Sequence, residues 1–161
     1  MRSARAPLQT EAEIMDAALS LLSRREYSET ELTRKLLEKT EQQHHVERVL
    51  ARVQEFGYQN DQRYTESYIR YGISQGKGEN WLIMKLRQKG VPPALIEACL
   101  YEADTCWQDI ALAQLERKFK NQGCDLQEKA RWYRFLAARG FNPDAIAAAV
   151  ERHAQKQLDC T

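Results

Sequence analysis

This chain of 161 residues is poor in cysteine, and its four cysteines stand far apart. They lack the close paired spacing of a zinc site or a thioredoxin-type motif, so we expect reduced thiols that mostly serve packing: Cys99, Cys106, Cys124 and Cys160. Long apolar runs are also missing. A membrane span needs about 20 apolar residues, and no stretch approaches this length. The N-terminus also lacks the apolar segment of a signal peptide. The sequence therefore predicts a cytoplasmic protein with no membrane partner.

Helix-breaking residues are scarce too, with seven glycines and four prolines, and no segment alternates as a strand does. Capping boxes or other N-caps start helices at Thr10, Ser28, Thr105, Asp125 and Asn142, and glycines end them at Gly57, Gly90, Gly123 and Gly140. These signals predict an all-α protein of about nine helices, at residues 10–25, 28–39, 41–56, 61–75, 78–89, 92–104, 105–122, 125–139 and 142–158.

The chain also repeats itself with a period of fifty residues. Matching apolar positions fall in step at Leu32, Leu82 and Trp132, at Leu36, Leu86 and Leu136, and at Val46, Ile96 and Ile146. A period of this length in helical sequence indicates stacked supersecondary units. We therefore expect an elongated, curved tandem array of three three-helix repeats, at residues 10–60, 61–104 and 105–161, built of helix-turn-helix-like units and preceded by a flexible N-terminus at 1–9.

Net charge is only +1, but the charges are unevenly distributed. Residues 62–96 hold six basic residues against two acidic ones, and residues 117–139 hold seven against two. Such helix faces suit phosphates or an acidic protein groove, with salt-sensitive binding. The competing interpretation is that bases in a last helical turn only stabilise the helix dipole. The candidate contact residues are Arg70, Lys77, Lys85, Arg87, Lys89, Arg131, Arg134 and Arg139.

Other motifs indicate structure rather than chemistry. The tyrosines Tyr58, Tyr64, Tyr68 and Tyr71 cluster along the sequence. The last three form a helical stripe that is typical of a core, although the cluster also suits stacking on unpaired bases. Histidines and possible nucleophiles are not spaced for a metal site or a triad, so we predict no catalytic residue, metal or cofactor. A helix-turn-helix transcriptional repressor is the alternative function, although the helix starts at Pro92 and Pro143 lack residues suited to base readout.

Four stretches, taken in order, resemble the bacterial regulatory proteins of the RecX family, which modulate the RecA recombinase. They are RREYSETELTRKL at 24–36, FGYQNDQRY at 56–64, KGENWLIMKLRQKGV at 77–91 and RFLAARGF at 134–141. The resemblance spans residues 14–155, and the chain departs from the family pattern at Gln59, where leucine is more common. By motif position, Gly57, Tyr58, Asp61 and Arg63 belong to a structural junction between copies one and two, with Asp61 expected to cap the fourth helix and Arg63 to bridge carboxylates.

The resemblance implies a monomeric array of tandem three-helix repeats that associates with the groove of the RecA filament on single-stranded DNA. It implies inhibition of strand exchange, ATP hydrolysis and coprotease activity, either by blocking filament growth or by promoting filament disassembly. Weak direct binding to single-stranded DNA is implied as well, with double-stranded DNA as a further candidate. Such a regulator is no enzyme, and it belongs to DNA repair, recombination and the SOS response.

Overall fold

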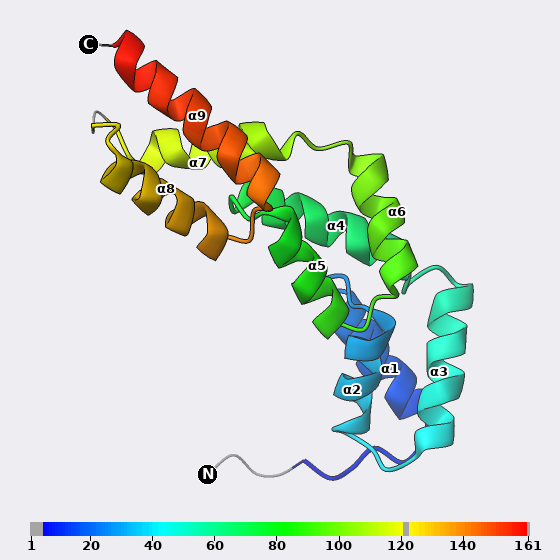
Figure 1. Ribbon diagram of the computed structural model, residues 1–161. Coiled ribbons are helices and arrows are strands. Elements are labelled where there is room, and N and C mark those ends of the chain that lie inside the picture. Colours follow the sequence, from blue (N-terminus) through cyan, green and yellow to red (C-terminus); the bar gives the residue numbers. More distant parts are fainter. Residues whose placement is uncertain (1–4, 121–122, 161) are drawn as a thin grey trace. The chain divides into compact units, whose positions relative to one another are not determined.

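The computed structural model describes residues 5–120 and 123–160, and this part of the chain contains nine α-helices and no strand (Figure 1). The helices are α1 (Glu11–Leu22), α2 (Glu29–Leu37), α3 (Gln43–Glu55), α4 (Asp61–Ser74), α5 (Glu79–Gln88), α6 (Pro93–Ala103), α7 (Trp107–Lys118), α8 (Leu126–Ala138) and α9 (Pro143–Asp159). The predicted all-α class is therefore confirmed. No helix in the described ranges is long and apolar enough to cross a membrane.

Side-chain caps begin four helices where the sequence predicts them. Thr10, Ser28, Asp125 and Asn142 accept hydrogen bonds from the amides of Glu13, Glu31, Glu128 and Ala145, respectively. The cap predicted at Thr105 is wrong, because α7 begins only at Trp107 and its N-cap, Cys106, makes no side-chain capping bond. The residue before Thr105, Asp104, adopts φ +45° after α6 and so ends that helix in the left-handed region, which leaves Thr105 in the connection.

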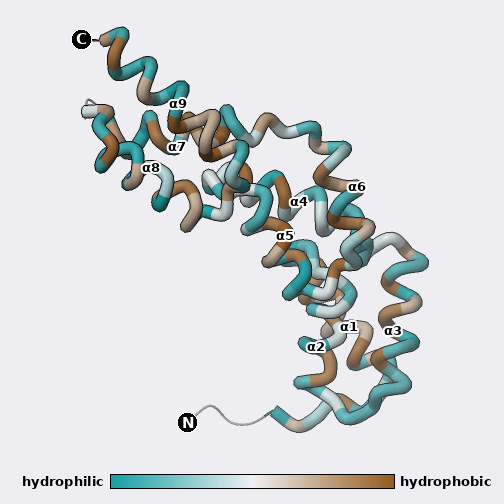
Figure 2. The backbone as a smooth tube through the Cα atoms, in the orientation of Figure 1, coloured by the Kyte–Doolittle hydropathy of each residue, from teal (hydrophilic) through white to brown (hydrophobic). Residues whose placement is uncertain are grey.

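The helices form two compact units, each with its own core. Unit 1 comprises Met1–Ser67 with Arg87–Cys99, and unit 2 comprises Tyr68–Leu86 with Leu100–Thr161. In unit 1, α1, α2 and α3 surround Leu32 and Leu36, whereas in unit 2, α7, α8 and α9 surround Trp132 and Leu136. Figure 2 shows hydrophobic and hydrophilic residues mixed along each helix, as expected when one stripe of a helix is buried.

The fifty-residue register is visible in the burial of matching positions. Leu32, Leu82 and Trp132 are fully buried, and so are Leu36, Leu86 and Leu136. Val46, Ile96 and Ile146 on the third helices are buried as well. Because the same positions are buried in all three copies, the tandem three-helix repeat is confirmed.

One backbone contact recurs with the same period, at the carbonyl that follows the second helix of each copy. In unit 1, the carbonyl of Lys89 accepts from the Ser28 hydroxyl at 2.7 Å. In unit 2, the carbonyl of Arg139 accepts from the amide of Gly78 at 2.9 Å. Ser28 and Gly78 directly precede α2 and α5. The turn that follows α5 therefore contacts the start of α2, and the turn that follows α8 contacts the start of α5.

In the first copy, the matching carbonyl is bound by the segment that precedes α1. The carbonyl of Lys39 accepts from the amide of Leu8 at 2.8 Å, and the hydroxyl of Thr40 donates to the carbonyl of Leu8 at 2.7 Å. Leu8 also packs against the core of unit 1. The turn after α2 therefore contacts Leu8, which lies within the segment 1–9 that we expect to be a flexible N-terminus.

Candidate nucleic-acid and partner interface

The residues that the family motif assigns to a junction lie together in unit 1, around Arg63 in the first turn of α4. Its Nε donates to Glu26 Oε1 at 2.7 Å, and its two Nη atoms donate to the carbonyls of Gly57 and Tyr58 at 2.9 and 3.0 Å. One guanidinium thus ties the loop before α2 to the turn after α3, in the fork geometry that suits arginine. Because these donors are used inside the unit, we assign Arg63 to structure rather than to ligand contact.

Asp61 does not cap α4 as expected. Asn60 does, accepting from the Arg63 amide at 3.0 Å, whereas Asp61 Oδ1 accepts from the amide of Glu29, the first residue of α2, at 2.9 Å. The side chain of Gln59 is buried and donates to the same Asp61 oxygen at 3.1 Å. The Asp61 carboxylate would be favoured at the start of α2 or of α4, since each presents the positive end of a helix dipole. Tertiary packing places it at the start of α2.

Glu31 joins copies one and two within unit 1. Its carboxylate, 9% exposed, accepts from the Tyr64 hydroxyl at 2.5 Å and pairs with Arg25 at 2.9 Å and with Lys89 at 3.7 Å. Burial lowers the pKa of Arg25, but the hydrogen bond and the charge of Glu31 outweigh burial and raise that pKa above its ordinary value. Lys89, predicted as a contact residue, is therefore engaged inside the unit.

Two further candidates in unit 2 also have internal partners. Arg131 Nη1 lies 3.0 Å from Glu128 Oε1 one turn earlier in α8. Arg139 Nη1 donates to the carbonyl of Gln75 at 3.2 Å, and its guanidinium carbon lies 5.0 Å from the centre of the Phe135 ring. These contacts orient both side chains without neutralising Arg139, because a carbonyl and an aromatic ring carry no net charge.

Lys77 and Lys85 lie over the ring of Trp81 in unit 2, with their ammonium nitrogens 5.3 and 5.8 Å from its centre. Tyr68 stacks on the same ring at a centroid distance of 6.0 Å. Tyr71 meets Tyr68 edge-on and is 55% exposed, so the tyrosine stripe predicted as core is only partly buried. Two cations thus flank a half-buried ring of an aromatic cluster whose outer member, Tyr71, is exposed, and such a cluster has the components of a base-stacking surface.

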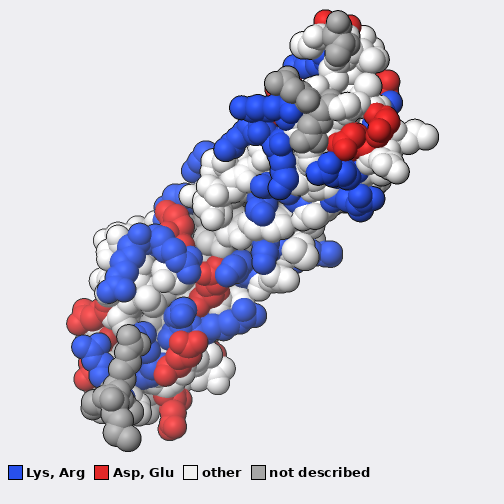
Figure 3. Space-filling model, turned by 90° about the vertical axis from the view of Figure 1, so that its left-hand side faces the viewer, with Lys and Arg blue, Asp and Glu red and all other residues white. Residues whose placement is uncertain are grey.

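Three candidates remain exposed and unpaired. Arg70, Arg87 and Arg134 form no salt bridge or cation–π contact with any residue that the structure describes. Arg70 and Arg134 belong to unit 2 and Arg87 to unit 1, so the candidates are not confined to one unit. Figure 3 shows Lys and Arg side chains gathered on the α8 side of unit 2, with few Asp and Glu among them.

Sequence reasoning left four of the seven bases in residues 117–139 out of the candidate set, and two of these four lie beside Arg139. Arg117 and Lys118 end α7, and the Lys118 ammonium lies 5.1 Å from the centre of the Phe135 ring, which Arg139 also covers. The excess of bases in residues 117–139 includes both. Only the packing of α7 with α8, however, brings them beside Arg139.

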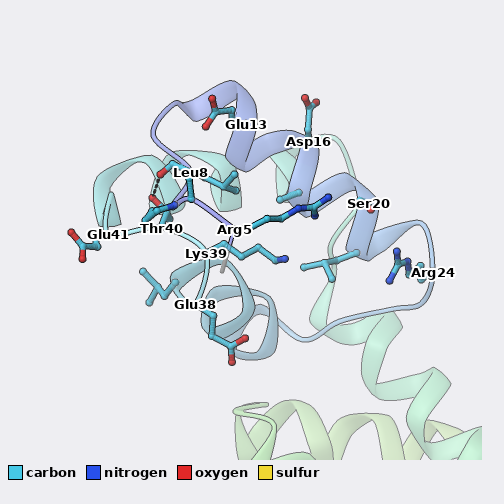
Figure 4. A pocket seen from close by; sticks show the side chains of 15 residues that line it. Arg5, Leu8, Glu13, Asp16, Ser20, Arg24, Glu38, Lys39, Thr40 and Glu41 are labelled. Carbon is cyan, nitrogen blue, oxygen red and sulfur yellow. Dashed lines mark hydrogen bonds between the residues drawn. The ribbon is translucent and has the colours of Figure 1, made fainter. Parts of the chain in front are cut away.

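A cavity of about 790 Å³ beside α1 and the end of α2 was not expected either. Figure 4 shows the side chains of Arg5 and Lys39 across this space, Leu8 bonded to Thr40, and Glu41 pointing away. The lining mixes both signs of charge with apolar side chains, so it favours no single class of charged ligand. In the part of the chain described, no group of three or more His, Cys, Asp or Glu residues could hold a metal ion.

Comparison with known proteins assigns the family. Sequence models of three RecX domains match in order, the first three-helix domain at residues 15–52, the second at 60–100 and the third at 107–150. The regulatory protein RecX of Legionella pneumophila (strain Corby) is 41% identical over 133 residues, covering 82% of this chain and 89% of that protein. The chain belongs to the RecX family. Regulatory protein RecX of Mannheimia succiniciproducens is a further relative, 39% identical over 81% of this chain and 87% of its own.

Two solved RecX structures share the fold. RecX from Lactobacillus salivarius superposes with a TM-score of 0.74 at 19% identity, over 90% of this chain and 97% of that chain. A structure of regulatory protein RecX gives a TM-score of 0.73 at 23% identity, over 88% of this chain and 73% of that chain. The relatives are named regulatory proteins, which supports a regulatory role for this RecX family member.

Proposed function

We propose that this protein binds the RecA filament on single-stranded DNA and inhibits the recombinase, ATPase and coprotease activities of RecA. It blocks filament growth or promotes filament disassembly, acts as a monomer in the cytoplasm, and performs no catalysis of its own. The ordered match of all three domains to a family of regulatory proteins carries the proposal.

The surface of unit 2 supports this function physically. Lys77 and Lys85 flank an aromatic cluster, and Arg70 and Arg134 stand exposed without a carboxylate partner among the described residues. A nucleoprotein filament presents phosphates and acidic protein side chains, both of which attract such cations. Because the net charge is only +1, we expect binding to free DNA to be weak at physiological salt.

Single-stranded-DNA-dependent ATP hydrolysis by RecA of the same bacterium tests the proposal. This protein is titrated from far below the RecA concentration up to equimolar. Inhibition at substoichiometric ratios indicates capping of filament ends, and inhibition only near equimolar indicates coating of the groove. Unchanged hydrolysis at every ratio would refute the regulator proposal.

A helix-turn-helix repressor is distinguished by a second measurement. Such a repressor binds duplex DNA in a sequence-dependent manner, usually as a dimer, whereas the proposed regulator shows little dependence on duplex sequence. Electrophoretic mobility shifts with duplexes of unrelated sequence separate the two functions, and analytical ultracentrifugation checks for the monomer.

A further inference from the structure

Unit 2 contains a basic cavity of about 520 Å³ where α4, α7 and α8 end. Ser74 ends α4 and Gln75 follows it. The other lining residues are Gln114, Arg117 and Lys118 near the end of α7, Phe135 near the end of α8, and Arg139 directly after α8. Among the residues that the structure describes, no Asp or Glu lines this cavity. All of the lining residues belong to one compact unit, so the site depends on a single packed core.

The cations of this cavity have no anionic partner within the described ranges. Arg117, Lys118 and Arg139 form no salt bridge with any carboxylate there. Lys118 and Arg139 instead share the Phe135 ring, at 5.1 and 5.0 Å from its centre. Three like charges converge here, and an incoming anion would relieve their mutual repulsion.

The positive charge of Arg117, Lys118 and Arg139 is larger than the negative partial charge of the helix C-termini around the cavity. Each of the three helix C-termini contributes a partial charge of about −0.5, which sums to about −1.5 against three full positive charges. A net positive charge therefore remains in a cavity whose rim also offers the side-chain amides of Gln75 and Gln114 as neutral donors.

We propose that this cavity binds a phosphate group of the nucleic-acid backbone, with Arg117, Lys118 and Arg139 as its cationic ligands. The guanidinium forks suit phosphate oxygens, and Phe135 orients two of the three cations. The proposal deepens the proposed function, on which it rests, by assigning the contact with the DNA of the filament to one place in unit 2. The aromatic cluster around Trp81 belongs to the same unit.

The test compares two double variants that remove the same charge. Arg117→Gln with Lys118→Gln changes the cavity, whereas Lys120→Gln with Lys129→Gln removes two cations that do not line it. Binding of a fluorescein-labelled oligothymidylate is followed by anisotropy at several salt concentrations, without RecA. For the cavity variant we expect about tenfold weaker binding. We also expect the slope of log Kd against log salt concentration to decrease by about one for each phosphate that the protein no longer neutralises. Equal weakening in both variants would overturn the proposal.

A second readout separates the backbone from small anions. The side-chain amides of Gln75 and Gln114 are monitored by NMR during titration with oligothymidylate and, separately, with inorganic phosphate. Shifts with the oligonucleotide at concentrations where inorganic phosphate has no effect support the backbone site, whereas equal shifts with inorganic phosphate identify a small-anion site and overturn it. The wild-type RecA ATPase assay judges the regulator proposal separately, because neither binding readout contains RecA.

Discussion

Single polar residues around Glu31 and Gln59 hold copy one to copy two in unit 1. The sequence predicts a local cap at Ser28 and Glu31, yet the Glu31 carboxylate turns to Tyr64, Arg25 and Lys89. The Gln59 side-chain amide donates to the Tyr27 carbonyl in copy one at 3.2 Å and to Asp61 Oδ1 in copy two at 3.1 Å. A buried polar group that lacks hydrogen bonds destabilises the fold. These residues therefore favour the one arrangement of the junction in which their hydrogen bonds form.

The Tyr64→Phe variant measures the strongest of these contacts. Because the hydroxyl donates to a carboxylate at 2.5 Å, its loss should lower the free energy of unfolding by about 2 kcal/mol. Urea denaturation followed by circular dichroism gives the value. Tyr71→Phe, on an exposed ring, is the control and should change the free energy by no more than about 0.5 kcal/mol. Equal effects of the two variants would contradict a special role for the Glu31 contact.

His153 should make the stability of unit 2 depend on pH. Its ring is 1% exposed, Nε2 lies 3.1 Å from the Phe119 carbonyl, and Nδ1 has no hydrogen-bond partner in the described part of the chain. Burial lowers the pKa of His153 below 6.5, although the Phe119 carbonyl and the charge of Glu116 favour the protonated ring. The unfolded chain therefore binds the proton more tightly, so stability is complete above pH 6.5 and falls as the pH decreases below that value.

Replacing the ring with a side chain that cannot titrate tests this explanation. His153→Gln keeps a donor toward Phe119 but should reduce the difference in unfolding free energy between pH of about 7.5 and about 5.5. The exposed His44 provides the control variant, His44→Gln. A pH dependence that persists unchanged in His153→Gln would assign it to other groups.

At the scale of elements, helix ends determine how copies join. The turns after α2, α5 and α8 each offer a carbonyl that a preceding segment binds. Gly140 lies in the last of these turns, at φ +86°, and a Cβ there would come within 2.6 Å of the Trp81 backbone nitrogen. The glycine is therefore required both by backbone conformation and by the close approach of α5.

Gly140→Ala should consequently destabilise the protein by about 3 kcal/mol, from left-handed strain together with the clash. Gly57→Ala is a matched control, because Gly57 has φ +75° but no atom within 4 Å of its would-be Cβ. This control should cost about 1 kcal/mol, from backbone strain alone. Thermal unfolding of both variants measures the difference, and equal destabilisation would exclude the close approach as a cause.

For the whole molecule, three sequence repeats correspond to only two compact units. The helices of copy two are divided, because α4, α5 and α6 each contribute residues to both units. The candidate bases follow this division, with Arg87 and Lys89 in unit 1 and the other six in unit 2. Lys89 pairs with Glu31, so its reversal would disturb folding as well as binding.

Charge reversal is therefore best confined to unpaired residues of unit 2. Arg70→Glu with Arg134→Glu should raise the concentration needed to half-inhibit RecA ATP hydrolysis by about tenfold, through repulsion from an anionic filament. The control is Arg34→Glu with Lys35→Glu on the exposed side of α2. This double variant changes the net charge of the protein by the same amount, but in unit 1. If both double variants inhibit like the wild type while helicity is retained, these two arginines do not contact the filament.

The sequence by itself determined the helices, most of their caps and the fifty-residue register, because capping and a buried stripe at helical spacing depend on residues within a few positions of one another. Tertiary structure decided which partners Glu31, Asp61 and Leu8 bind, since several helix ends offer equivalent groups and only packing selects among them. It also decided that Arg117 and Lys118 of α7 meet Arg139 after α8. That cluster joins residues distant along the chain, so no local pattern specifies it.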